Sequence, residues 1–335
     1  MKQKKQKKPR IIVSDPIHKE AVALLKKSGF LVHERLHLPR EAVHEILPHY
    51  DALICRTNTK VTKDLLGTST RLRCIGLAST GYDQIDLEEA SRKNIAVFGL
   101  PSHNKDIDPR IHGNFISTAE HTILLMLAAL GNFYEATKSL KEGRWEKSRY
   151  VGKEAYKKTL GIIGLGRIGS LVADRARAFG MEIIAYDPYV SKETMKTHGV
   201  KKVSLAGLCK KSDIITIHVP KTPETISLLD SEKFKLMKKG VILINAARSE
   251  VVEKKALLKA LKSGTVYRMG VDVFTDEPHG IEWDLVAIEN VIPTPHIAGS
   301  TEEALRRISL GVAQSIINFF KKNEAANIIN IKKIV

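Results

Sequence analysis

Short apolar runs alternate with helical segments along the first hundred residues. Between the runs, polar and apolar positions follow helical spacing, most clearly over residues 20–27. Strands that alternate with helices form βαβ units, so this part of the chain predicts a parallel sheet. The predicted strands are 9–15, 30–36, 50–56, 72–78 and 94–99.

The segment 117–143 predicts a helical arm. Ser117 is followed three positions later by Glu120, the spacing of a capping box, and the first half of the segment is apolar on nearly every side. A helix of that kind has to be buried all round. We expect it to be buried between two subunits; a central core helix is the alternative.

A second βαβ series follows and predicts a doubly wound sheet. It opens with a strand over 159–164, a helix over 170–179 and a strand over 182–187. Sheets of this type bind ligands at the carboxyl edge of their strands, where we expect the functional site. Four further strands are predicted at 213–220, 240–247, 267–274 and 290–296.

The turn after the strand 159–164 has the spacing of a dinucleotide-binding loop. Gly164, Gly166 and Gly169 fall at G-x-G-x-x-G, with a strand before them and a helix after them. The glycines allow a tight turn and close approach of a pyrophosphate to the helix N-terminus. Asp187 closes the next strand, where a carboxylate binds ribose hydroxyls and repels a 2′-phosphate, so NAD is favoured over NADP. A glycine-rich turn without a ligand is the alternative.

Polar side chains at the ends of the later strands predict an acid/base site. His218, Arg248, Asp272, Glu277 and His296 all lie at or just after those ends, so they should converge on one edge of the sheet. A carboxylate from Glu277 beside the imidazole of His296 would raise its pKa and fix its tautomer. The guanidinium of Arg248 matches a carboxylate or an α-keto acid. A nucleotide loop, a forked cation and an acid/base pair together predict a dehydrogenase.

Composition sets limits on the other classes. A chain of 335 residues with 43% hydrophobic residues predicts two domains of ordinary size. Its three cysteines are odd in number and lack metal-ligand spacing, which argues against a disulfide scaffold or a metal site and fits a reducing cytoplasm. We expect no secretory signal and no membrane span, since the longest apolar run is 123–130.

The net charge of +17 lies partly in the Lys-rich first ten residues, which predict a solvated tail. Nucleic-acid binding is the alternative for this tail. It is disfavoured because no aromatic residue interleaves with the lysines and no recognition helix for base contacts follows.

Several motifs resemble the D-isomer-specific 2-hydroxyacid dehydrogenases. Within this family the chain is most similar to the phosphoglycerate dehydrogenases of serine biosynthesis that lack a C-terminal regulatory domain. The resemblance implies a catalytic triad of Arg248, Glu277 and His296. His296 would be the general acid in ketone reduction and the base in alcohol oxidation, tuned by Glu277, while Arg248 holds the substrate. The motifs are CRTNTKVT, LASTGYDQIDLEEASRKNI, STAEHTILLML, LKEGRWE, TLGIIGLGRIG, YDPY, HVPKTPET, INAARSEVVEKKAL, GVDVFTDEP and PTPHIAGST.

The resemblance also implies binding residues. Substrate contacts would come from Arg56, Ser79, Thr80, Gly81 and Arg248. The implied NAD contacts are Thr80, Gly164, Gly166, Arg167, Ile168, Gly169, Asp187, His218, Val219, Pro220, Ala246, Ala247, Arg248, Asp272, His296 and Gly299.

The implied fold is α/β with two Rossmann-like domains and parallel sheets. The substrate domain, flavodoxin-like and discontinuous, would comprise 1–103 and 298–335. The NAD domain would comprise 104–297 and include a helical arm that pairs two subunits in a cytoplasmic homodimer.

Three positions depart from the family pattern. Ser249 follows the active arginine in place of glycine, and Glu253 replaces an aspartate. Gly131 stands where relatives often carry an arginine that reaches a substrate phosphate. The segment 101–114 is about ten residues longer than its flanking motifs require. Its basic residues are expected to supply the missing anion contact; an ordinary solvated insertion is the alternative. The basic residues are Lys105, Arg110, His103 and His112.

Two alternative functions follow from the resemblance. One is a glyoxylate or hydroxypyruvate reductase. The other, of a different class, is a non-enzymatic NAD-sensing scaffold, because a shared fold does not fix function. Formate dehydrogenase is disfavoured, since that branch differs at the position of Glu277.

Overall fold

A computed structural model describes residues 8–99, 113–275, 277, 282–322 and 327–330. The chain divides into two compact units, one of Met1–Asn114 with Ser300–Val335 and the other of Phe115–Gly299. The basic residues expected to bind an anion, Lys105, Arg110, His103 and His112, lie outside the described residues.

The first unit contains a five-stranded parallel sheet in the order β2-β1-β3-β4-β5. All five predicted strands are confirmed. The order reverses between β1 and β3, as in flavodoxin-type sheets, so the carboxyl ends of the strands form a crevice there. The strands are β1 (Arg10–Val13), β2 (Leu31–Glu34), β3 (Ala52–Cys55), β4 (Cys74–Leu77) and β5 (Ala96–Phe98).

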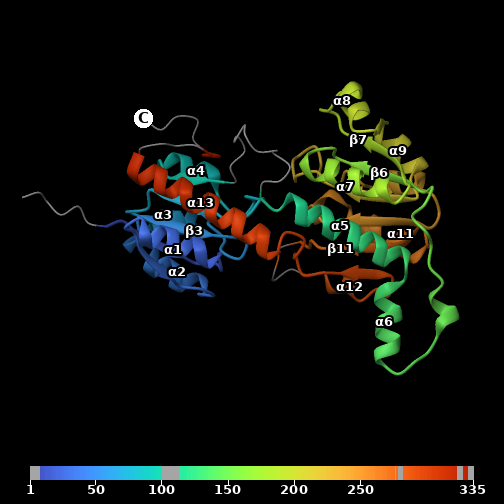
Figure 1. The fold of residues 1–335 in the computed structure, drawn as a ribbon, viewed down its shortest axis with the longest axis horizontal. Coiled ribbons are helices and arrows are strands. Elements are labelled where there is room, and N and C mark those ends of the chain that lie inside the picture. Colours follow the sequence, from blue (N-terminus) through green and yellow to red (C-terminus); the bar gives the residue numbers. More distant parts are fainter. Residues whose placement is uncertain (1–7, 100–112, 276, 278–281, 323–326, 331–335) are drawn as a thin grey trace, which may run out of the picture. The chain divides into compact units, whose positions relative to one another are not determined.

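Helices cover both faces of this sheet (Figure 1). One face packs against α1 (Lys19–Lys27) and α13 (Glu302–Lys322), whose apolar side chains share a buried cluster. The other face packs against α2 (Arg40–Ile46), α3 (Lys63–Thr68) and α4 (Leu87–Arg92), and η1 (Leu47–His49) follows α2. The C-terminal part of the chain therefore completes the domain that the N-terminal part begins.

The second unit contains a seven-stranded parallel sheet in the order β12-β11-β10-β9-β6-β7-β8. The predicted strands are confirmed, and the two-residue edge strand β8 is an addition that its Lys-Lys sequence did not indicate. The order reverses between β6 and β9, which places the glycine-rich turn at the switch point of the sheet. The strands are β6 (Thr159–Ile163), β7 (Glu182–Tyr186), β8 (Lys201–Lys202), β9 (Ile214–Ile217), β10 (Val241–Asn245), β11 (Val266–Val271) and β12 (Val291–Pro293).

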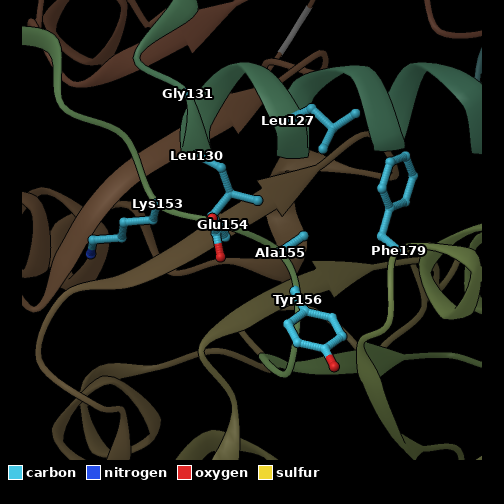
Figure 2. Close-up of a pocket in the computed structure, with 8 residues that line it drawn as sticks. All are labelled: Leu127, Leu130, Gly131, Lys153, Glu154, Ala155, Tyr156 and Phe179. Carbon is cyan, nitrogen blue, oxygen red and sulfur yellow. The ribbon is translucent and has the colours of Figure 1, made fainter.

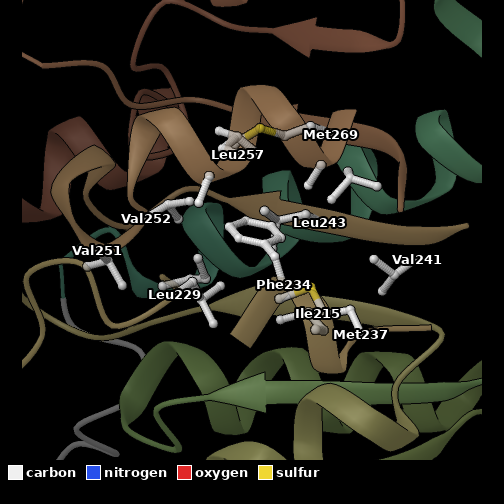
Figure 3. Packing of buried hydrophobic residues seen from close by; sticks show 14 of the residues in the cluster. Ile215, Leu229, Phe234, Met237, Val241, Leu243, Val251, Val252, Leu257 and Met269 are labelled. Atoms are coloured by element: carbon white, nitrogen blue, oxygen red, sulfur yellow. The ribbon is translucent and has the colours of Figure 1, made fainter. Parts of the chain in front are cut away.

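Alternate strand residues face two helical layers. Leu243 of β10 packs in the cluster shown in Figure 3, with Phe234 and Leu257 from the helices of that face. Ile244, the next residue, points to the opposite face, where α5 packs on β10 and β11 and α7 packs on β6 and β7. The remaining elements are α5 (Phe115–Leu130), α6 (Phe133–Lys141), η2 (Lys147–Tyr150), α7 (Arg167–Ala178), α8 (Lys192–Thr197), α9 (Leu205–Lys211), α10 (Ser231–Leu236), η3 (Ser249–Val251), α11 (Lys254–Lys262) and α12 (Trp283–Val286).

Helix α5 differs from its prediction at its start. It begins at Phe115, so Ser117 lies inside the helix and the predicted capping box is wrong. Burial explains the earlier start: the Phe115 ring is only 2% exposed, and the guanidinium of Arg167 lies over it at 4.2 Å from the centroid. Ten of the sixteen residues of α5 are buried, whereas Leu124 and Leu127 are exposed. The alternative of a central core helix therefore explains the burial of most of α5, while Leu124 and Leu127 remain as an exposed apolar strip.

Among the described residues, Cys55, Cys74 and Cys209 are buried free thiols. No group of three or more His, Cys, Asp or Glu side chains in this part of the chain is arranged to hold a metal ion. The helices among the same residues are also too short or too polar to cross a membrane.

Candidate active site

The glycine-rich turn after β6 needs glycine at two positions for steric reasons. Gly164 has φ +90°, and a Cβ there would lie 2.7 Å from the carbonyl oxygen of His218. A Cβ on Gly169 would collide with the carbonyl oxygen of Gly164. Gly166 is different, since no atom lies within 4 Å of the place its Cβ would take. The turn is therefore packed against the sheet on one side and open at Gly166.

This open side coincides with the N-terminus of α7. The helix begins at Arg167, directly after Gly166, and no side chain caps its first N–H groups. Uncapped N–H groups and the positive end of the helix dipole attract an anion. The turn therefore fits the pyrophosphate of NAD, with Arg167, Ile168 and Gly169 in the first helical turn.

Asp187 ties the glycine-rich turn to the end of β7. One carboxylate oxygen accepts a hydrogen bond from the Leu165 amide and the other from the Tyr189 amide, each at 2.9 Å. A carboxylate has about four acceptor positions, so each oxygen keeps one for a further donor. Binding of ribose hydroxyls is compatible with this structural role, which the sequence did not indicate.

His218 ends the neighbouring strand β9 and is held neutral. Its Nε2 lies 2.9 Å from the Thr216 hydroxyl, and its Nδ1 is buried without a hydrogen-bond partner among the described residues. Burial lowers the pKa of His218 to about 3. The imidazole can line a nucleotide site but carries no charge near neutral pH. Val219 and Pro220 follow it directly.

The loop after β10 presents Arg248. Asn245, the buried last residue of β10, accepts the Ala247 amide at 3.0 Å and donates to the Arg248 carbonyl at 2.9 Å. Both bonds fix the course of the backbone through Ala246 and Ala247. Sequence reasoning missed Asn245, although a polar residue at the end of an apolar strand was a usable signal.

His296 and Glu277 form an ion pair at the same edge of the sheet. Nδ1 of His296 contacts Oε2 of Glu277, and Oε1 of Glu277 accepts the Phe274 amide at 2.5 Å. The hydrogen bond between His296 and Glu277 raises the pKa of His296, whereas burial and the positive charge of Arg248 act to lower it. The imidazole stays 39% exposed, so its Nε2 remains available to a substrate. The predicted pairing is confirmed as a contact.

A buried carboxylate anchors the loop that carries His296. Asp272, fully buried, accepts hydrogen bonds from the amides of Ile297 at 2.9 Å and Ala298 at 2.8 Å. It also accepts the hydroxyl of Thr294 at 2.6 Å. The resemblance implied Asp272 as a cofactor contact; in the structure its two oxygens bind the loop that carries His296, which Gly299 closes.

The other unit holds the predicted substrate residues at the carboxyl ends of β3 and β4. Gln84, which sequence reasoning missed, donates to the Arg56 carbonyl at 3.0 Å and to the Ser79 hydroxyl at 3.1 Å. Ser79 donates to the Gly81 carbonyl at 2.7 Å, and Thr80 between them bonds to the side chain of Asn114.

Arg56 itself is a half-buried cation in this unit. The buried carboxylate of Asp15 accepts its amide at 2.6 Å. The guanidinium Nε has no hydrogen-bond partner among the described residues, and burial lowers the pKa of this group. A partly desolvated guanidinium of this kind fits an anionic ligand.

Comparison with known proteins identifies the family. The model of the D-isomer specific 2-hydroxyacid dehydrogenase, NAD binding domain, matches residues 123–298, more than half of the chain. A protein named D-3-phosphoglycerate dehydrogenase from Archaeoglobus fulgidus is 40% identical over 325 residues, and one from Methanocaldococcus jannaschii is 42% identical over 326. Each match covers 97% of this chain and 60% of the relative, so the chain spans about 60% of the length of these relatives.

A similar fold is seen in solved structures. D-lactate dehydrogenase from Aquifex aeolicus, complexed with NAD and lactic acid, superposes with a TM-score of 0.79 at 30% identity and covers 97% of this chain and 100% of that chain. A D-isomer specific 2-hydroxyacid dehydrogenase from Polaromonas has a TM-score of 0.85 at 26% identity, covering 96% and 99%. The glycine-rich turn and the His296–Glu277 pair both fall within the matched domain, and the chain belongs to the D-isomer-specific 2-hydroxyacid dehydrogenases.

Proposed function

We propose that the protein is an NAD-linked dehydrogenase that interconverts a D-2-hydroxy acid and its 2-keto acid, with D-3-phosphoglycerate as its substrate. The His296–Glu277 pair carries the proposal for the reaction, because it places a tuned imidazole at the same carboxyl edge of the sheet as the nucleotide turn. The phosphorylated substrate is supported by relatives named D-3-phosphoglycerate dehydrogenase at 40% and 42% identity.

The residues divide the chemistry between them. NAD, when bound, supplies the hydride acceptor for oxidation of the alcohol. His296 takes the hydroxyl proton on Nε2, and Glu277 stabilises the resulting imidazolium. Arg248 binds the substrate carboxylate through its planar fork. In the reverse direction His296 returns the proton to the carbonyl oxygen.

We assign substrate recognition in the first unit to Arg56 and the 79–81 loop. The half-buried Arg56 favours an anion, and backbone amides of the loop bind carboxylate oxygens. Gly131, at the end of α5, offers no side chain to a phosphate. The lack of a phosphate contact at this position favours a smaller hydroxy acid, such as glycerate, as the second candidate substrate.

Initial rates with a panel of 2-hydroxy and 2-keto acids test the proposal. We expect 3-phosphoglycerate with NAD to give the highest kcat/KM. Faster turnover of glycerate, glyoxylate or hydroxypyruvate would assign the reductase alternative. Negligible turnover of every acid, together with measurable NADH binding, would identify a scaffold.

We further propose that two copies of the chain pair through α5, α6 and the segment 143–157. Their exposed apolar side chains include Leu140 at 58% and Trp145 at 81% exposure. A cavity of about 490 Å³ lies against α5 and the same segment, lined by residues such as Leu127, Tyr156 and Phe179 (Figure 2). Exposed apolar surface of this extent marks an interaction site.

Light scattering on matched variants tests the dimer. Leu140→Glu should convert it to monomers, whereas Leu31→Glu, at a residue 45% exposed in the other unit, should leave the mass unchanged. A monomeric wild-type protein would contradict this proposal.

A cytoplasmic location is also proposed, since all three cysteines are free thiols.

A further inference from the structure

A second histidine lies behind the catalytic loop. His121, on α5, places Nε2 at 3.0 Å from the Thr294 hydroxyl and 3.6 Å from Oδ1 of Asp272. The side chain of His121 is 10% exposed and that of Asp272 is fully buried. The cluster is therefore shielded from water, and none of its three side chains has a role in the proton transfer described above.

The protons in this cluster can be assigned by counting donors. Thr294 has one hydroxyl proton, and its oxygen lies 2.6 Å from Oδ1 of Asp272, an acceptor. The hydroxyl must donate to that carboxylate, because two acceptors at this separation would repel. Its oxygen is then an acceptor toward His121, whose Nε2 must carry a proton. Burial lowers the pKa of His121, against the charge of Asp272, and so favours the neutral ring. The hydrogen bond to Thr294 then places the one ring proton on Nε2.

This chain of hydrogen bonds ends at the two residues that follow the catalytic histidine. Asp272 holds the amides of Ile297 and Ala298, which immediately follow His296. His296 itself has φ +53°, in the left-handed region that a β-carbon disfavours. Such a conformation persists only where the surrounding contacts impose it.

We propose that His121 is a positioning residue for catalysis: its Nε2–H bond orients the Thr294 hydroxyl toward Asp272 and so holds His296 in its reactive conformation. The proposal rests on the proposed function. It goes beyond the triad of Arg248, Glu277 and His296, because it assigns a role to a residue of α5 that acts through Thr294 and Asp272.

Three substitutions test the proposal kinetically. His121→Leu removes the donor and Thr294→Val removes the relay, so each should lower kcat about tenfold, the loss expected for one buried bond to a charged network. The KM for NADH should change less than about twofold, since the glycine-rich turn is untouched. His121→Gln keeps an N–H donor near the position of Nε2 and should restore kcat to within about threefold of wild type.

A matched control separates positioning from stability. His33→Leu removes the 2.8 Å bond between His33 Nδ1 and the Tyr50 hydroxyl in the other unit. It should lower the Tm as much as His121→Leu does while leaving kcat unchanged. A His121→Leu enzyme with wild-type kcat, or a His121→Gln enzyme as slow as His121→Leu, would overturn the proposal.

Nuclear magnetic resonance gives a test that does not depend on turnover. In wild type the ¹⁵N shifts of His121 should show a protonated Nε2 and an unprotonated Nδ1. The amides of Ile297 and Ala298 should be protected from hydrogen exchange, and at least about tenfold less so in His121→Leu. A proton on Nδ1, or unchanged protection, would refute the proposal. A wild-type protein inactive on every acid would refute the proposed function alone, and these two measurements would still decide whether His121 holds the loop.

Discussion

Replacing Glu277 by glutamine removes one charge from the acid/base pair and keeps its shape. The carboxylate contacts Nδ1 of His296 and also accepts the Phe274 amide at 2.5 Å. In Glu277→Gln the amide oxygen can keep the bond to Phe274, which turns the amide nitrogen toward His296. The neutral imidazole then has to accept at Nδ1 and carry its proton on Nε2. The variant therefore disfavours both the imidazolium and the tautomer needed for a base.

The direction of the effect follows from the charge of the pair. An opposite charge in contact favours the ionised form of a group. The side chains of His296 and Glu277 are 39% and 26% exposed, so solvent screens part of this interaction. Because Glu277 raises the pKa of His296, its loss lowers that pKa. Ketone reduction needs protonated His296, so activity should be lost at a lower pH than in wild type.

The assay is kcat/KM for reduction of the keto acid with NADH as a function of pH. The falling limb should move to lower pH in Glu277→Gln. Alcohol oxidation should slow about a hundredfold or more, the usual contribution of a general base. The matched control is Glu282→Gln, outside the pair, which should leave the limb in place. An unshifted limb in Glu277→Gln would remove Glu277 from the proposed mechanism.

Two further predictions concern the cofactor turn. Asp187 should make kcat/KM at least about tenfold higher with NADH than with NADPH, because its carboxylate repels a 2′-phosphate, and equal values would refute its role. Gly166→Ala should weaken NADH binding about tenfold or more at unchanged Tm, since a Cβ there enters open space, whereas Gly169→Ala should also lower the Tm by colliding with Gly164. For the two glycine variants, calorimetry measures the Tm and fluorescence titration measures the affinity for NADH. A Gly166→Ala protein that binds NADH normally would show that the open side of the turn is not the pyrophosphate site.

The sequence by itself determined all strands but β8, their parallel arrangement and the residues at the carboxyl edges of the sheets. Apolar runs of strand length leave little freedom in a βαβ pattern, and parallel strands bring their carboxyl ends to one edge. Glu277 and His296, 19 residues apart, could therefore be paired in advance. The need for glycine at 164 and 169 could also be predicted from the sequence, because the atoms that a Cβ would strike belong to the same turn and to the adjoining strand end.

Only the tertiary structure decided what holds these residues in place. The start of α5 at Phe115 depends on a ring buried beside Arg167, which overrides the local capping signal at Ser117. His121 bonds to Thr294 across 173 residues. Such a bond leaves no periodic trace in the sequence, because it depends on how a helix packs against the sheet. Hydrophobic periodicity fixes which face of an element is buried, but it does not specify which polar atoms meet there, such as those of His121, Thr294 and Asp272 behind the loop of His296.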